Sequence, residues 1–246
     1  MAAQRLIFLA MLALGGCAPS SYSWGWYVVS PFNERGWKNV SFLLGGLLTT
    51  IEVSLAAIAI AMVIGLALAI AGLSRSKAWR AFYRVYVELV RALPTLVLLL
   101  WVYYGLPVVF GLEFGVFTAG VITLAVSDSA FEAEVFRAGI QSIGKGQIEA
   151  AQAIGLRPWQ VMRFVVLPQA IRRILPALGN QFVYVLKMSS LISVVGLSDL
   201  TRRANELTLA EYRPLEIYSF LIGEYLILIL IVSWGIRRME RALAQD

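Results

Sequence analysis

An apolar run from Leu43 to Ala71 constrains this chain more than any other feature of its sequence. The run is longer than the about 20 residues that an α-helix needs to cross a bilayer, and Glu52 is its only charged residue. Only helices and closed barrels satisfy their backbone hydrogen bonds inside a bilayer. Because 59% of the 246 residues are hydrophobic and the mean hydropathy is +0.76, we expect an all-α integral membrane protein.

Four further segments are predicted to cross the membrane, which gives five core spans. The five cover about residues 43–71, 85–110, 114–138, 174–197 and 215–236. The third and fifth are weak by hydropathy alone because carboxylates interrupt them, namely Asp128, Glu132, Glu134, Glu216 and Glu224. We expect Pro94 to kink the second span, and Pro168 and Pro176 to set where the fourth begins. No internal repeat or linker is evident, so residues 43–238 are taken as one domain.

The first 20 residues form a separate hydrophobic segment with two open interpretations. Arg5 precedes an apolar run that ends in Leu14-Gly15-Gly16-Cys17. This order is typical of a secretory signal with a lipoprotein cleavage box, in which Cys17 becomes the lipidated N-terminus. It equally fits an uncleaved signal anchor. Residues 21–42 are polar and rich in Trp, which predicts an extracytoplasmic lead-in at the membrane interface.

The distribution of charge predicts the topology. Residues 75–91, 137–173 and 237–241 together hold 14 Lys and Arg against three Glu, whereas basic and acidic residues balance in the other loops. The positive-inside rule therefore places the 141–170 loop and the C-terminal tail, 239–246, in the cytoplasm. The net charge of +6 reflects this topology, and no basic face with interleaved aromatic residues indicates nucleic-acid binding.

Composition also excludes several kinds of chemistry. With no His and a single Cys, the chain has no Cys/His metal site, no internal disulfide and no His-based catalytic triad. Residues 139–146 resemble a phosphate-binding P-loop but end in Gly146 where Ser or Thr would hold magnesium, and they follow a membrane helix rather than a strand. We therefore expect no enzymatic activity, no metal and no cofactor on this chain.

The polar stretch between the third and fourth spans predicts two short helices that meet at a glycine. An Ala-rich helix containing Glu149, Ala150 and Ala151 is expected to end at Gly155 with a positive φ. Arg157-Pro158 then turns the chain into a second helix from about Trp159 to Phe164. Small residues that admit another backbone, beside large apolar residues such as Leu156 and Trp159, favour a knob that fits a pocket on another protein. The alternative is an amphipathic connector folded against its own bundle.

These residues carry a resemblance to a known family. Glu-Ala-Ala, three residues, Gly, nine residues and an aliphatic-x-Leu-Pro resemble the EAA signature of the membrane subunits of ABC-type importers, matched here by Glu149, Gly155, Val165, Leu167 and Pro168. The similarity extends through 131–143, 167–172, 179–182 and 187–191, in the manner of the polar amino-acid permease branch. It covers roughly Gly46 to Arg238.

The resemblance implies a fold, a function and partners. The fold is the five-core-span type I permease fold in the bacterial inner membrane. The function is amino-acid import by alternating access, coupled through Glu149, Ala150, Ala151, Gly155, Leu156 and Trp159 to two ABC ATPase subunits that hold ATP and magnesium. The other implied partners are a second permease, the same or similar, an extracytoplasmic amino-acid-binding protein and membrane lipid.

Ionisable residues inside a bilayer are costly and tend to line polar pathways. Asp128 and Glu132 share one helix face beside Ser127, where they can receive a substrate ammonium, and Lys187 can meet a carboxylate of the substrate or of Asp128. Glu52 either lines the cavity or reaches the interface. Glu134 and Arg137, three residues apart, are predicted to form a local ion pair instead. At Met188 the family more often has a polar residue, so its substrate contacts do not transfer directly.

Two rival functions remain open from the residues alone. An ion-gradient-driven secondary transporter would use Asp128, Glu132 and Lys187 as its relay, but it gives no reason for the EAA knob. A membrane assembly factor would use the loop to recruit a soluble partner without transporting anything.

Overall fold

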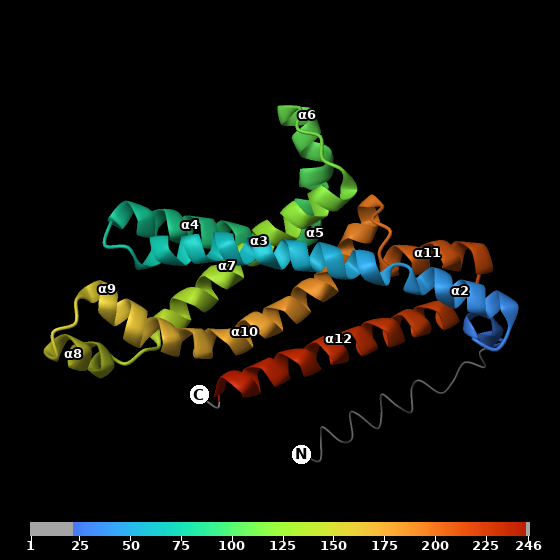
Figure 1. Cartoon of the computed structure of the whole chain (residues 1–246). Coiled ribbons are helices and arrows are strands. Elements are labelled where there is room, and N and C mark those ends of the chain that lie inside the picture. The colour runs from blue at the N-terminus through green and yellow to red at the C-terminus, as the bar shows by residue number, and fades with distance from the viewer. Residues whose placement is uncertain (1–21, 245–246) are drawn as a thin grey trace, which may run out of the picture.

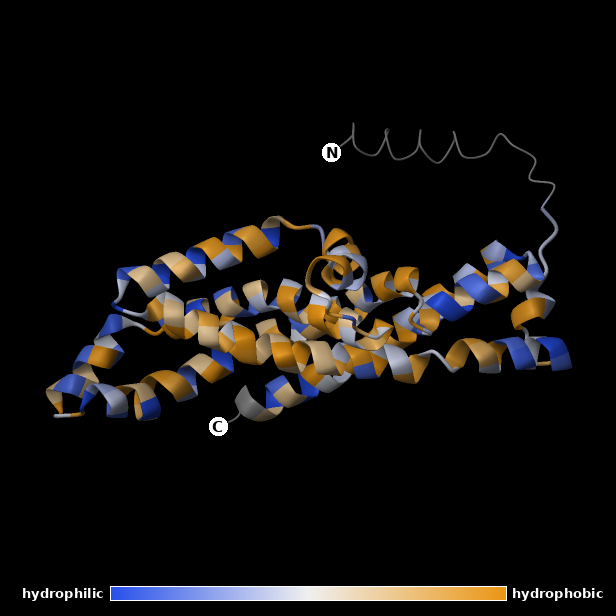
Figure 2. Cartoon of the chain, turned by 90° about the horizontal axis from the view of Figure 1, so that it is seen from above, coloured by the Kyte–Doolittle hydropathy of each residue, from blue (hydrophilic) through white to orange (hydrophobic). Residues whose placement is uncertain are grey.

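The computed structural model describes residues 22–244 as a bundle of helices, and no strand occurs among them. Long helices lie side by side, with α2 and α11 at one end and α8 and α9 at the other (Figure 1). Hydrophobic residues occupy the middle of the bundle and hydrophilic residues gather toward both ends (Figure 2). This distribution suits a middle in hydrocarbon and two ends in water, and the all-α prediction is confirmed. The expectations for residues 1–20 and Cys17 lie outside the described residues.

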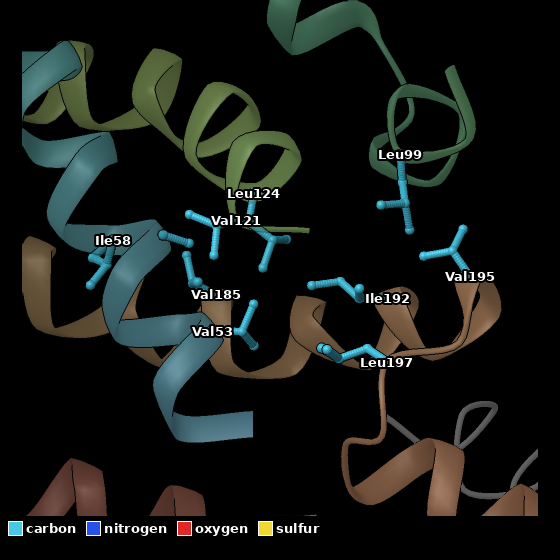
Figure 3. Packing of buried hydrophobic residues seen from close by; sticks show 10 residues of the cluster. Val53, Ile58, Leu99, Val121, Leu124, Val185, Ile192, Val195 and Leu197 are labelled. Carbon is cyan, nitrogen blue, oxygen red and sulfur yellow. The ribbon is translucent and has the colours of Figure 1, made fainter. Parts of the chain in front are cut away.

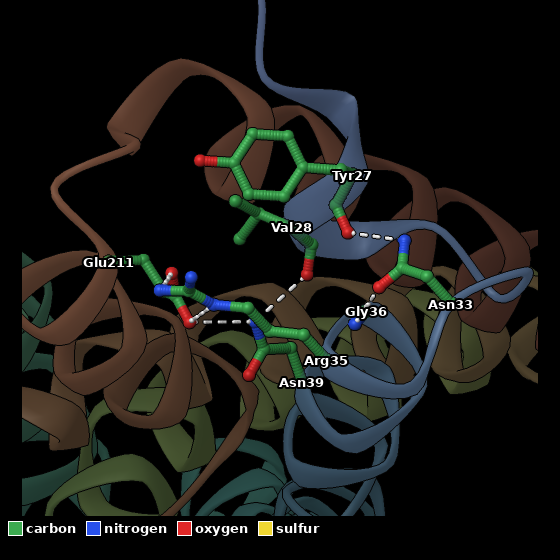
Figure 4. A network of polar contacts seen from close by, with 7 residues as sticks. All are labelled: Tyr27, Val28, Asn33, Arg35, Gly36, Asn39 and Glu211. Atoms are coloured by element: carbon green, nitrogen blue, oxygen red, sulfur yellow. Dashed lines mark hydrogen bonds and ion pairs between the residues drawn. The ribbon is translucent and has the colours of Figure 1, made fainter.

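A polar network fixes the end of the molecule where the described chain begins (Figure 4). It joins three helices: η1 (Trp26–Val29), α2 (Glu34–Leu44) and α11 (Leu200–Glu211). Arg35 lies 2.5 Å from one carboxylate oxygen of Glu211, and the other oxygen accepts a hydrogen bond from Asn39 at 3.0 Å. Burial favours the neutral acid, but the hydrogen bonds from Arg35 and Asn39 outweigh burial and lower the pKa of Glu211.

Small residues let the two central helices approach closely. These helices are α3 (Leu47–Leu73) and α7 (Val116–Gln141), and each carries small residues at a spacing of four. A Cβ added at Gly65 of α3 would lie only 2.6 Å from the Cβ of Glu132, 3.0 Å from the backbone nitrogen of Ala133 and 3.1 Å from the carbonyl oxygen of Ser129. The α3–α7 crossing therefore depends on backbone contact, as is common between membrane helices.

The first span is longer than the sequence predicted. The helical stretch runs from Glu34 to Leu73, 40 residues, because α2 leads into α3 through a tight connection at Gly45-Gly46. Part of the predicted lead-in, residues 21–42, is thus helical. The polar residues of α2 give it a low mean hydropathy, so hydropathy does not predict it as part of a span. The helix is amphipathic: it packs its apolar side against α11 and η1 and exposes its charges.

The second predicted span, residues 85–110, is not one kinked helix. It divides into α4 (Lys77–Ala92) and a second part, α5 (Thr95–Leu100) with its continuation to Phe110, and the two parts meet at 97°. Leu93 adopts an extended conformation before Pro94, because the proline ring disfavours the α conformation in the residue that precedes it. The second part projects away from the bundle (Figure 1).

Two π-helical turns each lead into a proline. They are η2 (Trp101–Gly105), which precedes α6 (Leu106–Phe110), and η3 (Met162–Val166), which precedes α10 (Leu167–Met188). In each turn a backbone N–H bonds five residues back, from Leu106 to Trp101 and from Leu167 to Met162. The wider turn lets the helix continue into Pro107 or Pro168, where an α-helical turn would lose a hydrogen bond and clash.

The helix of the predicted fourth span, residues 174–197, begins earlier in the chain than expected. Pro168 lies in the first turn of α10, directly after the π-helical turn, whereas Pro176 lies inside α10 and does not mark a helix start. The fourth membrane-crossing helical stretch begins at Pro158 and ends at Val195, after the 3₁₀ helix η4 (Ser189–Val195).

The apolar core lies where α3, α5, α7, α10 and η4 meet (Figure 3). Val53 of α3 and Val185 of α10 both belong to this core. Leu99, Leu124 and Ile192 are almost fully buried there as well. The last helix, α12 (Pro214–Ala244), packs along α10 and returns the chain toward the α8–α9 end. Among the described residues, four helical stretches are long and apolar enough to cross a membrane, and the bent pair would make a fifth.

Candidate functional sites

The predicted knob at one end of the bundle is present and is built by a glycine turn. The helix α8 (Lys145–Ala153) is followed two residues later by Gly155, whose φ of +88° confirms the expected left-handed conformation. The N–H of Leu156 bonds to the carbonyl of Ala151 at 3.1 Å, and that of Gly155 to Gln152 at 2.9 Å. This pair of bonds is a Schellman motif, which closes the helix C-terminus and reverses the chain.

The second helix of the knob continues into a membrane helix. α9 (Pro158–Val161) begins with proline in its first turn, and the side chain of Gln160 accepts from the backbone N–H of Arg157 at 2.8 Å. We expected a separate helix from about Trp159 to Phe164. Instead α9 passes through η3 into α10 with no break, so a displacement of the knob is also a displacement of α10.

The knob has an inner and an outer side. Ala151 is buried and Leu156 half-buried against the knob's own apolar cluster, which includes Val161 and Val166. Ala151 thus packs inward rather than toward a partner, because its small side chain lets α8 lie close to η3. The outer side exposes Glu149, Ala150 and Gly155 together with large apolar groups, namely Ile154 (79% exposed), Trp159 (56%) and Phe164 (58%).

Contacts between α7 and α10 hold the base of the knob. Arg173 donates to the carbonyl oxygen of Ser142 at 2.5 Å and to its hydroxyl at 3.0 Å. Gly139 lies so close to Ile174 that an added Cβ would fall 2.1 Å from the isoleucine side chain. The loop is therefore joined to both helices that enter and leave it, which suits the transmission of force.

A second candidate site is a polar cluster around α7 in the middle of the bundle. Asp128 is 3% exposed, and one of its oxygens accepts a hydrogen bond from the side-chain amide of Gln181 on α10. Ser127 bonds to Thr95 of α5 at 3.0 Å, and Ser129 to Tyr86 of α4 at 2.8 Å. Polar contacts from α7 thus reach α4, α5 and α10 within about one helical turn.

The two carboxylates predicted to act together have different surroundings. Glu132 is fully buried at the α3–α7 crossing, and neither of its carboxylate oxygens has a hydrogen-bond partner among the described residues. Asp128, one turn earlier, has one bonded and one unpartnered oxygen. A charge without a partner is expensive in such a place.

Lys187 and Glu52 do not join this cluster. Both side chains are exposed on the single chain, and within residues 22–244 neither forms an ion pair. The expected contact between Lys187 and Asp128 is not formed, because Gln181 is the α10 residue that reaches Asp128. The predicted local pair is confirmed: Arg137 lies 2.7 Å from Glu134, three residues earlier on the same helix.

Sequence reasoning gave no role to two residues that the tertiary structure singles out. Gln181 is the partner of Asp128, and an amide at mid-span was the available signal. Glu224 of α12 is 8% exposed, and its carboxylate oxygens have no partner among the described residues. It lines an apolar pocket of about 420 Å³ with Trp26, Leu47 and Ile227. The sequence marked Glu224 only as an interruption of the fifth span.

An all-helical bundle with a knob of two short helices at one end has the architecture of a type I ABC importer permease. Residues 41–245 match the family described as "Binding-protein-dependent transport system inner membrane component", and the chain belongs to this family. The match covers every described helix from the end of α2 onward.

Individual relatives agree with this assignment. The glutamine transport system permease protein GlnP of Escherichia coli (strain K12) is 38% identical over 209 residues, which cover 83% of this chain and 94% of GlnP. A putative GlnP of Rickettsia typhi is 35% identical with the same coverage. The crystal structure of an amino acid ABC transporter with histidines superposes with a TM-score of 0.82 at 37% identity, covering 90% of this chain and all of that one. The MetNI methionine transporter shares the fold, with a TM-score of 0.71 at 23% identity.

These similarities fix the class of the protein. The chain is the permease subunit of an ABC importer, an inner-membrane transport protein rather than an enzyme. The secondary-transporter alternative is not favoured, because the matching family is that of binding-protein-dependent transport systems.

Proposed function

We propose that this permease moves polar amino acids across the bacterial inner membrane by alternating access. In this proposal two ATPase subunits, which carry ATP and magnesium, bind the α8–α9 knobs of two permeases, and an extracytoplasmic binding protein delivers the substrate. The knob and the C-terminus face the cytoplasm, as the positive-inside rule indicates.

The observation that carries this proposal is the exposed outer side of the knob. Ile154, Trp159 and Phe164 are more than half exposed, although water-facing loops seldom present several large apolar side chains together. Basic residues surround them, including Arg157 and Arg163. An apolar centre with a charged rim is typical of a protein interface, so the knob suits a groove on a soluble ATPase.

A continuous helical stretch connects the knob to the polar cluster around Asp128. The knob is continuous with α10 through η3, and α10 carries Gln181, which bonds to Asp128. A rigid displacement of α10 would therefore change the surroundings of Asp128. Such a displacement needs only two packed states of the bundle, each favoured by different partners.

The arm formed by α5, η2 and α6 projects from the bundle, and its exposed apolar residues favour contact with a second permease subunit. Trp101, Val108 and Phe110 on this arm are 51%, 85% and 63% exposed. The arm leaves the bundle after the 97° bend, and among residues 22–244 no helix covers the side that carries these three residues (Figure 1). A second copy or a similar chain would cover part of them, and lipid the remainder.

An amino acid is the proposed cargo because relatives with 34–38% identity are named for glutamine and a structural neighbour for amino acids. One carboxylate oxygen of Asp128 has no partner in the part of the chain that the structure describes, which suits an ammonium group. The choice among amino acids belongs to the binding protein, since no residue of the cluster distinguishes their side chains.

Purification of the complex tests the proposed partners, and reconstitution into vesicles tests the proposed transport. We expect the tagged chain, extracted in mild detergent, to carry an ATPase and a second permease in stoichiometric amounts, identified by mass spectrometry. In vesicles, amino-acid uptake should require ATP and survive collapse of the ion gradient. Uptake that survives ATP depletion but stops with the gradient would contradict the proposal, and an assembly factor would give no uptake at all.

Asp128→Asn should reduce amino-acid uptake by about tenfold without changing assembly. The substitution keeps the size of the side chain and its ability to accept from Gln181, but it removes the charge offered to an ammonium. Initial uptake rates in vesicles measure the effect, and gel filtration measures assembly. Glu224→Gln is the matched control, since it neutralises another buried carboxylate outside the cluster; unchanged uptake in Asp128→Asn would contradict the substrate role.

A further inference from the structure

A polar pocket of about 500 Å³ lies between α3, α4 and α7, apart from the knob and the Asp128 cluster. Its walls are formed by Gly72, Arg80, Tyr83, Arg84, Glu134 and Arg137. Gly72 lies in the last turn of α3 and Arg80 in the first turns of α4, so the pocket is at the end of the bundle that carries the knob (Figure 1).

One wall of the pocket is pre-organised. The guanidinium of Arg137 pairs with Glu134 at 2.7 Å and donates to the hydroxyl of Tyr83 at 3.0 Å, while Tyr83 also bonds to Glu134. Tyr83 is held against α3 because Gly72 has no side chain: a Cβ there would lie 3.0 Å from the tyrosine ring. These contacts fix a donor-rich surface before any ligand arrives.

The other wall carries unneutralised charge. Arg80 and Arg84 are one helical turn apart on α4, so both guanidinium groups reach the same side. In the part of the chain from 22 to 244, neither side chain has a hydrogen-bond or ion-pair partner. Glu134 balances Arg137, which leaves the pocket with two positive charges. Paired guanidinium groups suit the tetrahedral oxygens of a phosphate ester.

Exposed apolar side chains also occur on α4, outside the pocket. Trp79, Phe82, Val85 and Leu89 are each 53–62% exposed, and the first two rings pack edge to face at 6.2 Å. They occupy the outward side of α4, away from the buried Tyr83 and Val87 and on the opposite side of the helix from Arg80 and Arg84. Exposed apolar groups on a helix whose other side carries arginines suit the boundary between hydrocarbon and lipid headgroups.

We propose that this pocket binds the phosphate of an anionic phospholipid. Basic pockets between membrane helices, at the level of the headgroups, commonly hold such lipids. Because the pocket joins α4 to the end of α7, which leads directly into the knob, a bound lipid would brace the helix that positions α8. The inference concerns binding alone and holds whatever the importer transports.

Native mass spectrometry of the intact purified complex tests this proposal. The delipidated complex is titrated with phosphatidylglycerol, with phosphatidylethanolamine, and with inorganic phosphate as the water-soluble source of the same chemistry. We expect one tight phosphatidylglycerol per permease chain, retained at least about tenfold more strongly than phosphatidylethanolamine and not displaced by millimolar phosphate.

Variants locate the site. Arg80→Gln with Arg84→Gln should lower phosphatidylglycerol retention by at least about tenfold, and Arg80→Lys with Arg84→Lys should recover much of it. Arg172→Gln with Arg237→Gln removes the same charge at the same end of the bundle, outside the pocket walls, and should retain the lipid. Equal retention in the pocket and control variants would overturn the proposal, and displacement by inorganic phosphate would overturn the lipid as the ligand. Both outcomes are independent of uptake, so they are distinguishable from a failure of the proposed transport function.

Discussion

Gly155→Arg is expected to reduce ATP-driven uptake by at least tenfold while the protein still inserts and folds. Gly155 has a φ of +88°, a conformation that costs an L-residue about 1–2 kcal/mol, and it lies between α8 and α9 at the turn of the knob. Relief of this strain would tilt α8 relative to α9 and displace Ile154 and Trp159. An arginine would add a charged side chain on the exposed surface where we place the ATPase.

Measurement of uptake and ATP hydrolysis in the same vesicles checks this prediction. We expect ATPase activity without matching transport, or loss of the ATPase from the complex. Two variants separate the causes: Gly155→Asn tolerates the positive φ without adding charge, and Gly146→Arg adds the same charge where a Cβ meets nothing within 4 Å. Wild-type uptake in Gly155→Arg would remove the coupling role of the knob.

The second large effect is expected at the crossing of α3 and α7. Gly65→Leu should destabilise the permease by about 3 kcal/mol or more, which lowers its melting temperature by roughly 6–12 °C. The reason is that the added Cβ would lie 3.0 Å from the nitrogen of Ala133 and 3.1 Å from the carbonyl of Ser129, both backbone atoms. Backbone atoms cannot rotate away, so α7 must shift as a unit and open the core between Val53 and Leu124.

Thermal unfolding in detergent, followed by tryptophan fluorescence and gel filtration, measures the loss. Gly235→Leu is the matched control, because it places the same side chain in the long helix α12 where an added Cβ has no neighbour within 4 Å. We expect little change in the control. Equal melting temperatures for the two variants would show that the crossing does not depend on backbone contact at Gly65.

Features that depend on neighbouring residues in the chain were predictable. The Ala-rich helix, its end at Gly155 and the turn at Pro158 follow from local backbone preferences, and the structure has all three. The Glu134–Arg137 pair is set by helix geometry alone, since residues three apart lie on one face. The predicted third and fifth spans, residues 114–138 and 215–236, overlap α7 and α12.

Features that depend on packing between helices could not be predicted from the sequence. Hydropathy does not give the angle between two helices, so the 97° bend at Pro94 was predicted only as a kink. The π-helical turn before Pro168 was missed, because the sequence does not show how a helix relieves a proline clash. Which side of α10 faces α7 is likewise a matter of helix rotation. That rotation brings Gln181, not Lys187, to Asp128.

The sequence by itself determined that the chain is helical, crosses a membrane and carries an EAA loop, because each of these properties resides in a short stretch of residues with a fixed periodicity or spacing. The tertiary structure alone decided which carboxylates are buried without partners, which side of the knob is exposed, and that Arg80 and Arg84 of α4 share a pocket with Arg137 of α7. These are relations between segments that lie far apart in the chain. They arise only when close packing fixes the rotation and register of every helix.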